Sequence, residues 1–177
     1  AKPASVATPA EPWGRVDEAG IVSVREGSDW RVVGEYPDGT PDEALAYFGL
    51  GAFERARMLA TSVLETDPDI AGLNIAYAHH AMGLIAIAER RPATAAHHIA
   101  AGLDFMTQCG IEFTWTDEVD AIAAIAAQTG DLPLAATVFG IADRLHQQAG
   151  SPVSLPERTI YAAQRDATLR LLGADVP

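Results

Sequence analysis

A segment of this chain recurs with a shift of 40 positions, and this repeat constrains the fold more than any other feature. The stretch AMGLIAIAERRPATAAHHIAAG at 81–102 aligns with AIAAIAAQTGDLPLAATVFGIA at 121–142. The alignment pairs Ala81 with Ala121, Ala86 with Ala126, Ala95-Ala96 with Ala135-Ala136, and Ile99 with Phe139. Each copy reads as a helix of small residues, a short break and a second such helix. A period of this size, with one helix pair per repeat, is typical of an α-solenoid.

Helical patterns fill the chain from residue 40 onward. Thr40, Pro41 and Glu43 make a helix start, with Thr as N-cap, Pro at the first helical position and Glu three residues after the cap. Apolar residues then recur three or four positions apart, which places each set on one helix face. Gly110, Gly130, Gly150 and Gly173 stand where helices should end. The predicted helices span 41–49, 52–66, 70–90, 93–108, 116–129, 132–148 and 157–172.

The first forty residues have a different texture. Residues 1–12 are rich in Pro, Ala, Ser and Thr without an apolar period, and are expected to form a disordered arm. Three short β-branched and aromatic runs follow at 13–17, 21–25 and 30–36, separated by turn signals. They predict a small three-stranded β-meander within 13–40. The predicted fold is therefore mainly α, an antiparallel helix-pair solenoid over 41–177 that ends in a capping helix.

Composition excludes several classes of function. The 177 residues carry a net charge of −12, and the one adjacent basic pair, Arg90-Arg91, stands at a helix end, so direct nucleic-acid binding is not expected. No apolar run approaches the roughly 20 residues that span a bilayer. The opening AKPASVATPAEP lacks a basic start followed by an apolar segment, so we expect no signal peptide and a cytoplasmic location. A single cysteine, Cys109, permits neither an intrachain disulfide nor a cysteine-based zinc site.

The helical part resembles a class of bacterial regulators. The stretch LGAFERA at 50–56 resembles the turn of tetratricopeptide repeats. The closing third contains AAQTGD at 126–131, AA at 135–136, FGIADRL at 139–145, AGSP at 149–152, LPER at 155–158 and Tyr161. This order is similar to the C-terminal end of MalT-like and LuxR-type ATPase regulators. In those proteins a tetratricopeptide-like region follows a nucleotide-binding domain and accompanies a DNA-binding domain.

The resemblance covers residues 50–173 and implies a protein-binding or sensing part of a bacterial transcriptional regulator. The phosphate-binding motif G-x-x-x-x-G-K-[ST] does not occur in the sequence, and no helix-turn-helix is evident. On the resemblance, this chain would be the interaction part without the nucleotide-binding site.

The N-terminal part resembles a different family. The stretches WGRVDE at 13–18, VRE at 24–26, WRVVG at 30–34 and DEALAYF at 42–48 resemble the N-terminal module of an uncharacterised actinobacterial family. That family continues into a long coiled coil, whereas this chain turns to repeat-like sequence at Gly49. The departure predicts a fusion, natural or engineered, joined near Phe48. A proteolysis time course in which cleavage never separates the two parts would contradict that prediction.

Two histidine pairs, His79-His80 and His97-His98, raise the question of a metal site. Adjacent helical residues point about 100° apart, which does not suit two ligands of one metal ion. Counting from the turn near Arg91 at about 1.5 Å per residue places His79 about 19 Å along its helix and His97 about 9 Å along the next. This stagger of about two turns predicts that the pairs stay apart. We therefore expect solvent-facing or groove-lining histidines and no bound metal.

Other reactive residues have ordinary interpretations. Asp117, Glu118 and Asp120 could suggest a cation site or an acid–base pair, but acids in the first turn of a helix offset its dipole. Cys109 has no cationic neighbour in the sequence and is expected to be structural. No serine flanked by glycines precedes a suitable Asp and His order, so the sequence predicts neither catalytic residues nor a cofactor.

The sequence favours a non-enzymatic scaffold that binds a protein or peptide on its concave face. The predicted groove residues are Tyr77, His80, Trp115 and Gln128, all on the expected inner helices. Core packing is the alternative for Trp115, which could otherwise serve as an aromatic anchor. The acidic excess favours a basic or amphipathic partner. The alternatives are a helical pocket that senses a small molecule and a homo-oligomeric self-association domain.

Overall fold

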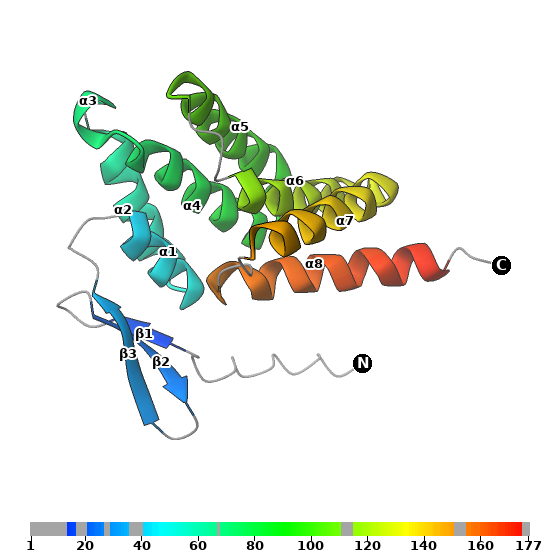
Figure 1. Cartoon of the computed structure of the whole chain (residues 1–177), viewed down its shortest axis with the longest axis horizontal. Helices are drawn as coiled ribbons and strands as arrows, with labels where there is room; N and C mark the ends of the chain where they lie inside the picture. Colours follow the sequence, from blue (N-terminus) through cyan, green and yellow to red (C-terminus); the bar gives the residue numbers. More distant parts are fainter. Residues whose placement is uncertain are drawn as a thin grey trace, which may run out of the picture.

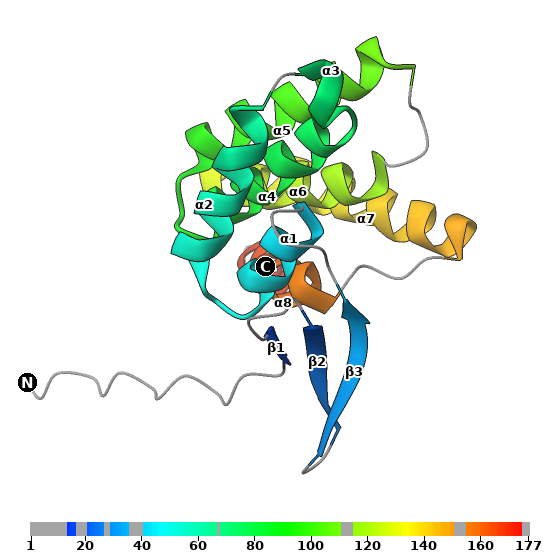
Figure 2. The same ribbon diagram turned by 90° about the vertical axis from the view of Figure 1, so that its left-hand side faces the viewer.

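The computed structural model describes residues 14–16, 21–26, 29–35, 41–66, 68–110, 115–150 and 155–174. The predicted arm at 1–12 lies outside these residues. Three strands, β1 (Gly14–Val16), β2 (Ile21–Glu26) and β3 (Asp29–Glu35), form an antiparallel sheet in the order β1-β2-β3. They fall at the three β-branched runs of the sequence. Figure 2 shows the sheet below α1 and α8, on the side opposite α5.

The helices pack as sequential antiparallel pairs, which confirms the mainly helical, paired architecture (Figure 1). Their bounds are α1 (Pro41–Gly49), α2 (Phe53–Leu64), α3 (Pro68–Ala71), α4 (Asn74–Ala88), α5 (Pro92–Gln108), α6 (Trp115–Thr129), α7 (Leu132–Ala149) and α8 (Leu155–Ala174). The pairs α4–α5 and α6–α7 correspond to the two copies of the 40-residue repeat. Local periodicity and the break residues therefore located α5, α6 and α7 correctly.

One predicted helix is divided. The sequence predicts a single helix over 70–90, but the structure ends α3 at Ala71 and begins α4 at Asn74. Gly72 lies between them with φ of +54°, a left-handed conformation that glycine adopts without steric cost, and its amide donates to the Pro68 carbonyl. The turn at Gly72 therefore separates α3 from α4.

Helix α4 is the centre of the core. It contacts α1, α2, α5 and α6, and its own apolar or small side chains are buried on every side of the helix. Leu84, Ile85 and Ile87 are fully buried there, on three different faces of the helix. A helix that is apolar all round must be covered on all sides, and the surrounding helices provide that cover.

Close contact between α4 and α5 depends on small residues. A Cβ atom added to Gly83 would lie 2.6 Å from Ile99 Cδ1, so the two helices touch at this point. Ala95 of α5 is fully buried, whereas Ala96 is exposed. The three-residue spacing of Ala96 and Ile99 suggests that they share a stripe, but the buried stripe of α5 includes Ala95 instead, about 100° away around the helix.

Helix α8 folds back over the preceding helices. It contacts α7 and α6 along the chain and also α1, the first helix (Figure 1). The predicted junction of a fusion near Phe48 falls within α1, whose Ala44 and Phe48 are buried in the helical core. None of the described helices combines the length and apolarity needed to cross a bilayer.

Candidate functional site

His80 lies in the interior and not on an open face. Its ring is 4% exposed, with Nδ1 3.0 Å from Glu118 of α6 and Nε2 3.2 Å from Glu157 of α8. The expectation of a solvent-facing or groove-lining His80 is therefore wrong. The physical reason is α8, which covers the side of α4 and α6 that an open stack of helix pairs would expose.

Charge pairing holds this buried cluster together. Burial alone would lower the pKa of His80, but the charges and hydrogen bonds of Glu118 and Glu157 outweigh it and hold the pKa well above its ordinary value of 6.5. The raised pKa favours the imidazolium form of His80, which lies between two carboxyl groups that are themselves buried. The cluster joins three helices, α4, α6 and α8, by ionic contacts in the interior.

Acidic residues at the start of α6 extend the cluster. Burial raises the pKa of Asp117 to about 6, and the charge of Glu157 adds to this effect. The Tyr161 hydroxyl of α8 donates to the Asp117 carbonyl at 3.3 Å. Asp117 and Glu118 do lie in the first turn, as the dipole interpretation requires, but that interpretation is incomplete because Glu118 and Asp120 are buried and paired.

A second set of charges joins α6, α7 and α8. Asp120 is fully buried, with one carboxylate oxygen 2.6 Å from His146 Nε2 and the other 3.5 Å from an Arg165 nitrogen. Arg165 also lies 2.8 Å from Asp143 of α7. Burial raises the pKa of Asp120, while His146 and Arg165 oppose that rise. Arg165 therefore connects the interior carboxylate to the surface of the molecule.

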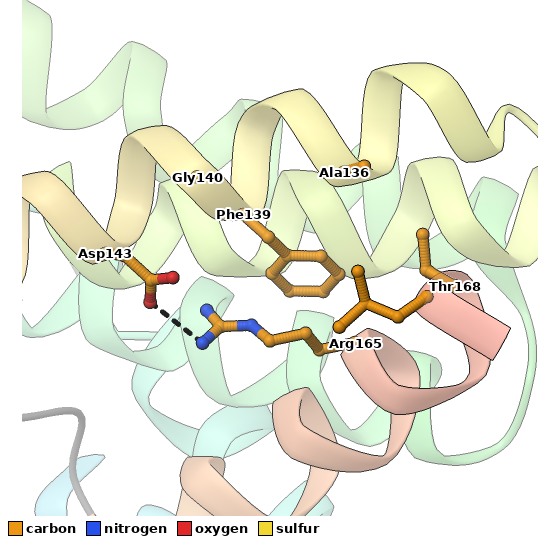
Figure 3. Close-up of a pocket in the computed structure, with 7 residues that line it drawn as sticks. Ala136, Phe139, Gly140, Asp143, Arg165 and Thr168 are labelled. Atoms are coloured by element: carbon orange, nitrogen blue, oxygen red, sulfur yellow. Dashed lines mark ion pairs between the residues drawn. The ribbon is translucent and has the colours of Figure 1, made fainter. Parts of the chain in front are cut away.

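A cavity of about 230 Å³ lies between α7 and α8 at this surface (Figure 3). Its lining residues are Ala136, Phe139, Gly140, Asp143, Arg165, Thr168 and Leu169. The Arg165 guanidinium stands 4.9 Å from the centre of the Phe139 ring, and Leu169 is 58% exposed. The cavity thus offers an apolar floor with one ion pair beside it, which suits an apolar side chain next to a charged one.

His80 and Gln128, two of the four predicted groove residues, make contacts between helices. Gln128 donates from Nε2 to the Ile87 carbonyl at 2.7 Å, so it joins α6 to the end of α4. Tyr77 is half-buried on α4. Trp115 begins α6, but its side chain lies outside the described part of the structure. His80 and Gln128 therefore act as internal contacts between helices.

The predicted separation of the histidine pairs is wrong. His79 Nδ1 and His98 Nδ1 are 3.1 Å apart across the α4–α5 hairpin, and the His97 ring centre is 5.3 Å from that of His98. Gly102 stands opposite His79, within one residue of the register that a turn centred at Arg91 gives, so the error lies in neglecting the reach of the side chains. His98 is four residues from Gly102, about one turn or 6 Å, and two imidazole rings bridge that offset.

Sequence reasoning missed the side chains of α8 that contact α4, α6 and α7. Glu157, Tyr161, Arg165 and Thr168 lie on one helix face because they are spaced four, four and three residues apart. All four are buried or half-buried, although this stripe is largely polar. The spacing was visible in the sequence, but only a search for polar stripes, in place of apolar ones, would have found it.

Comparisons with known proteins found no match. No family model matches the chain, and neither a curated protein nor a solved structure does so. Within the described residues, no group of three or more His, Cys, Asp or Glu side chains could hold a metal ion. The α7–α8 cavity and the ionic network behind it are the features from which a function can be argued.

Proposed function

We propose that this chain is a non-enzymatic, tetratricopeptide-like interaction module that binds an amphipathic helix of a protein partner at the α7–α8 cavity. The observation that carries the proposal is the apolar floor at Phe139 beside Leu169, a large apolar side chain left 58% exposed. A partner helix that places one apolar side chain in the cavity would cover Leu169. Such helix-in-groove binding relies on a few apolar anchors at helical spacing.

Charge favours a partner with basic residues beside its apolar face. The chain carries a net charge of −12, so an approaching basic segment is attracted at long range. At the cavity, the Asp143 side chain is 49% exposed, whereas Asp120 holds Arg165 from the interior side. A Lys or Arg of the partner could pair with Asp143 while Arg165 keeps its contact with Asp120.

This binding surface differs from the concave groove predicted from the sequence. There α8 covers the inner helices, and its Glu157 occupies the position next to His80 that a partner would need. In the proposal α8 is both the cap of the helix stack and one wall of the binding site. The resemblance to MalT-like and LuxR-type regulators suggests the setting, namely the protein-binding part of a bacterial transcriptional regulator.

A peptide-display selection against the intact chain tests the proposal. Enriched peptides should carry apolar residues three or four apart with Lys or Arg beside them, and Leu169→Glu should abolish their binding. Leu171→Glu is the matched control, because Leu171 is 54% exposed on the same helix and does not line the cavity. Peptides that bind both variants equally would contradict the assignment of this site.

Sensing of a small molecule is the second candidate, because Arg165 connects the cavity to the buried Asp120 and would transmit the presence of a ligand. The volume of about 230 Å³ is below the roughly 300–1,000 Å³ typical of ligand pockets, which favours a side chain over a whole ligand. Measurement of mass in solution separates both from self-association. A dimer that Leu169→Glu dissociates would identify a second copy as the partner.

A further inference from the structure

The contact between His79 and His98 has the dimensions of a metal chelate. Two nitrogens bound to one metal ion at about 2.0–2.1 Å are about 2.9 Å apart for a right angle and about 3.3 Å apart for a tetrahedral one. The observed separation of the two Nδ1 atoms, 3.1 Å, lies between these limits. We propose that His79 and His98 together bind a divalent late first-row metal ion, Cu²⁺, Ni²⁺ or Zn²⁺, across the α4–α5 hairpin.

The α4–α5 hairpin holds the side chains of His79 and His98 close together in the metal-free chain. The added Cβ at Gly102 would lie 3.4 Å from His79 Cβ, and Gly83 meets Ile99 of α5 at close range. The ring centres of His79 and His98 are 5.4 Å apart, with planes inclined by 42°. Because the helices are closely packed on both sides of the pair, the backbone stays in place on binding, and each ring turns so that the two Nδ1 lone pairs converge on the ion.

Burial and neighbouring charges favour the neutral form of both rings, which is the form that binds metal. Burial and the charge of His97 lower the pKa of His79. Burial, followed by His79, His97, Arg91 and Arg57, lowers the pKa of His98 to about 4. In the metal-free contact one Nδ1 donates to the other. Transfer of that proton to Nε2 of the same ring frees both Nδ1 lone pairs.

The surroundings leave coordination positions open. Both rings are only half-buried, so water completes the coordination shell. The neighbouring guanidinium groups of Arg57 and Arg91 oppose a cation, and both pair with Glu89, at 2.6 and 2.7 Å, whose single negative charge offsets part of theirs. His97 lies edge-on to His98 on the exposed side and is not a ligand in this arrangement. Two protein ligands with open positions describe an accessible site and not a structural zinc centre.

Calorimetric titration of the intact chain with Cu²⁺, Ni²⁺ and Zn²⁺ at pH 7 tests the proposal, in a Cys109→Ser background that removes the exposed thiol. We expect one ion per chain, with Cu²⁺ bound most tightly. His79→Gln and His98→Gln should each lower the affinity about tenfold or more. His97→Gln, the matched control on the same surface, should leave it within about threefold, since His97 is not a ligand.

Two results would overturn the site. One is equal affinity in the His79→Gln/His98→Gln double variant, with circular dichroism showing that it is folded. The other is a loss in His97→Gln as large as that in His79→Gln, which would place the metal on the adjacent pair of α5. Nitrogen NMR of the histidine rings gives an independent readout, because one equivalent of Zn²⁺ should shift Nδ1 of both His79 and His98.

Discussion

Two neighbouring alanines of α5 have opposite surroundings, although both belong to the repeat. Ala95 is fully buried against α4, and Ala96 faces outward. The alignment of the repeat could not distinguish them, because either alanine fits a three-to-four spacing with Ile99 or its neighbours. The phase of the buried stripe depends on how α5 rotates against α4, which is a tertiary property.

Ala95→Leu should lower the free energy of unfolding by about 1–3 kcal/mol, because the added carbons have no space between α5 and α4. Ala96→Leu is the matched control and should change it by less than about 0.5 kcal/mol. Urea denaturation of the two variants measures both values. Equal losses in both variants would mean that the assigned phase of α5 is wrong.

Removal of the His80 ring should be among the most destabilising single changes in the chain. His80→Ala leaves Glu118 and Glu157 buried without their shared cation, and loss of one partner of a buried ion pair costs about 3–5 kcal/mol. His97→Ala removes an exposed histidine and serves as the control. Denaturation at pH 7 measures this cost, and a value below about 1 kcal/mol would refute the pairing.

Asp117 and His98 should make opposite contributions to stability in acid. The folded pKa of His98, about 4, is below its ordinary 6.5, so its contribution is present above pH 6.5 and is lost as the pH falls towards 4. The folded pKa of Asp117, about 6, is above its ordinary 3.8, so its contribution is present below pH 3.8 and is lost as the pH rises through 6. Between pH 6.5 and 4.5, His98→Gln should reduce the loss of melting temperature and Asp117→Asn should increase it. The same slope in both variants would contradict these shifts.

Among the helices, α8 is the one whose packing position the sequence predicted least well. Capping residues and periodicity predicted its extent, because those signals are local. Its position could not be predicted in the same way, since the ionic contacts that hold it join residues far apart in the chain, Glu157 with His80 and Arg165 with Asp120. A stripe of polar side chains on a terminal helix is also typical of a solvent-exposed face. The sequence therefore favoured a capping helix α8 with this face exposed.

The attachment of α8 should weaken in alkaline solution. The folded pKa of His80 is raised, so its stabilising contribution is complete below the ordinary 6.5 and is lost as the pH rises through the folded value. Glu157→Gln should lower the pKa of His80 towards 6.5, so the decline in melting temperature should end at a lower pH and be smaller. Melting curves from pH 6.5 to 9.5 test this below the range where Tyr161 ionises, because burial raises the pKa of that phenol well above 10. A decline identical to that of the wild-type chain would show that Glu157 does not act on His80.

For the whole molecule, contact between α1 and α8 changes how stability is distributed. In an open repeat stack each pair touches only its neighbours, and the ends open independently. Here the first and last helices meet, and α4 lies inside the closed arrangement. The repeat predicted the helix pairs because it consists of residue spacings within neighbouring helices. The contact between α1 and α8 depends on where α8 packs, which the period of the repeat does not specify.

Hydrogen exchange at low denaturant concentration should therefore show α1 and α8 opening together, as one cooperative unit. The urea dependence of exchange should be the same for buried amides of the two helices, at Phe48 and at Thr168. Amides near the exposed end of α5, at Thr107 and Gln108, provide the comparison and should open with a smaller dependence. Independent opening of α1 and α8 would favour a linear stack.

Arg165 lies between the buried Asp120 and the surface Asp143, and this position links partner binding to the protonation of Asp120. It touches Asp143 at the cavity and Asp120 in the interior, so a partner that takes Asp143 shifts the guanidinium towards Asp120. That shift would lower the pKa of Asp120 and release protons on binding. By reciprocity, association would strengthen as the pH rises through the range in which Asp120 titrates. The affinity of a partner at Asp143 would then depend on the protonation of Asp120, a buried carboxylate that the partner does not contact.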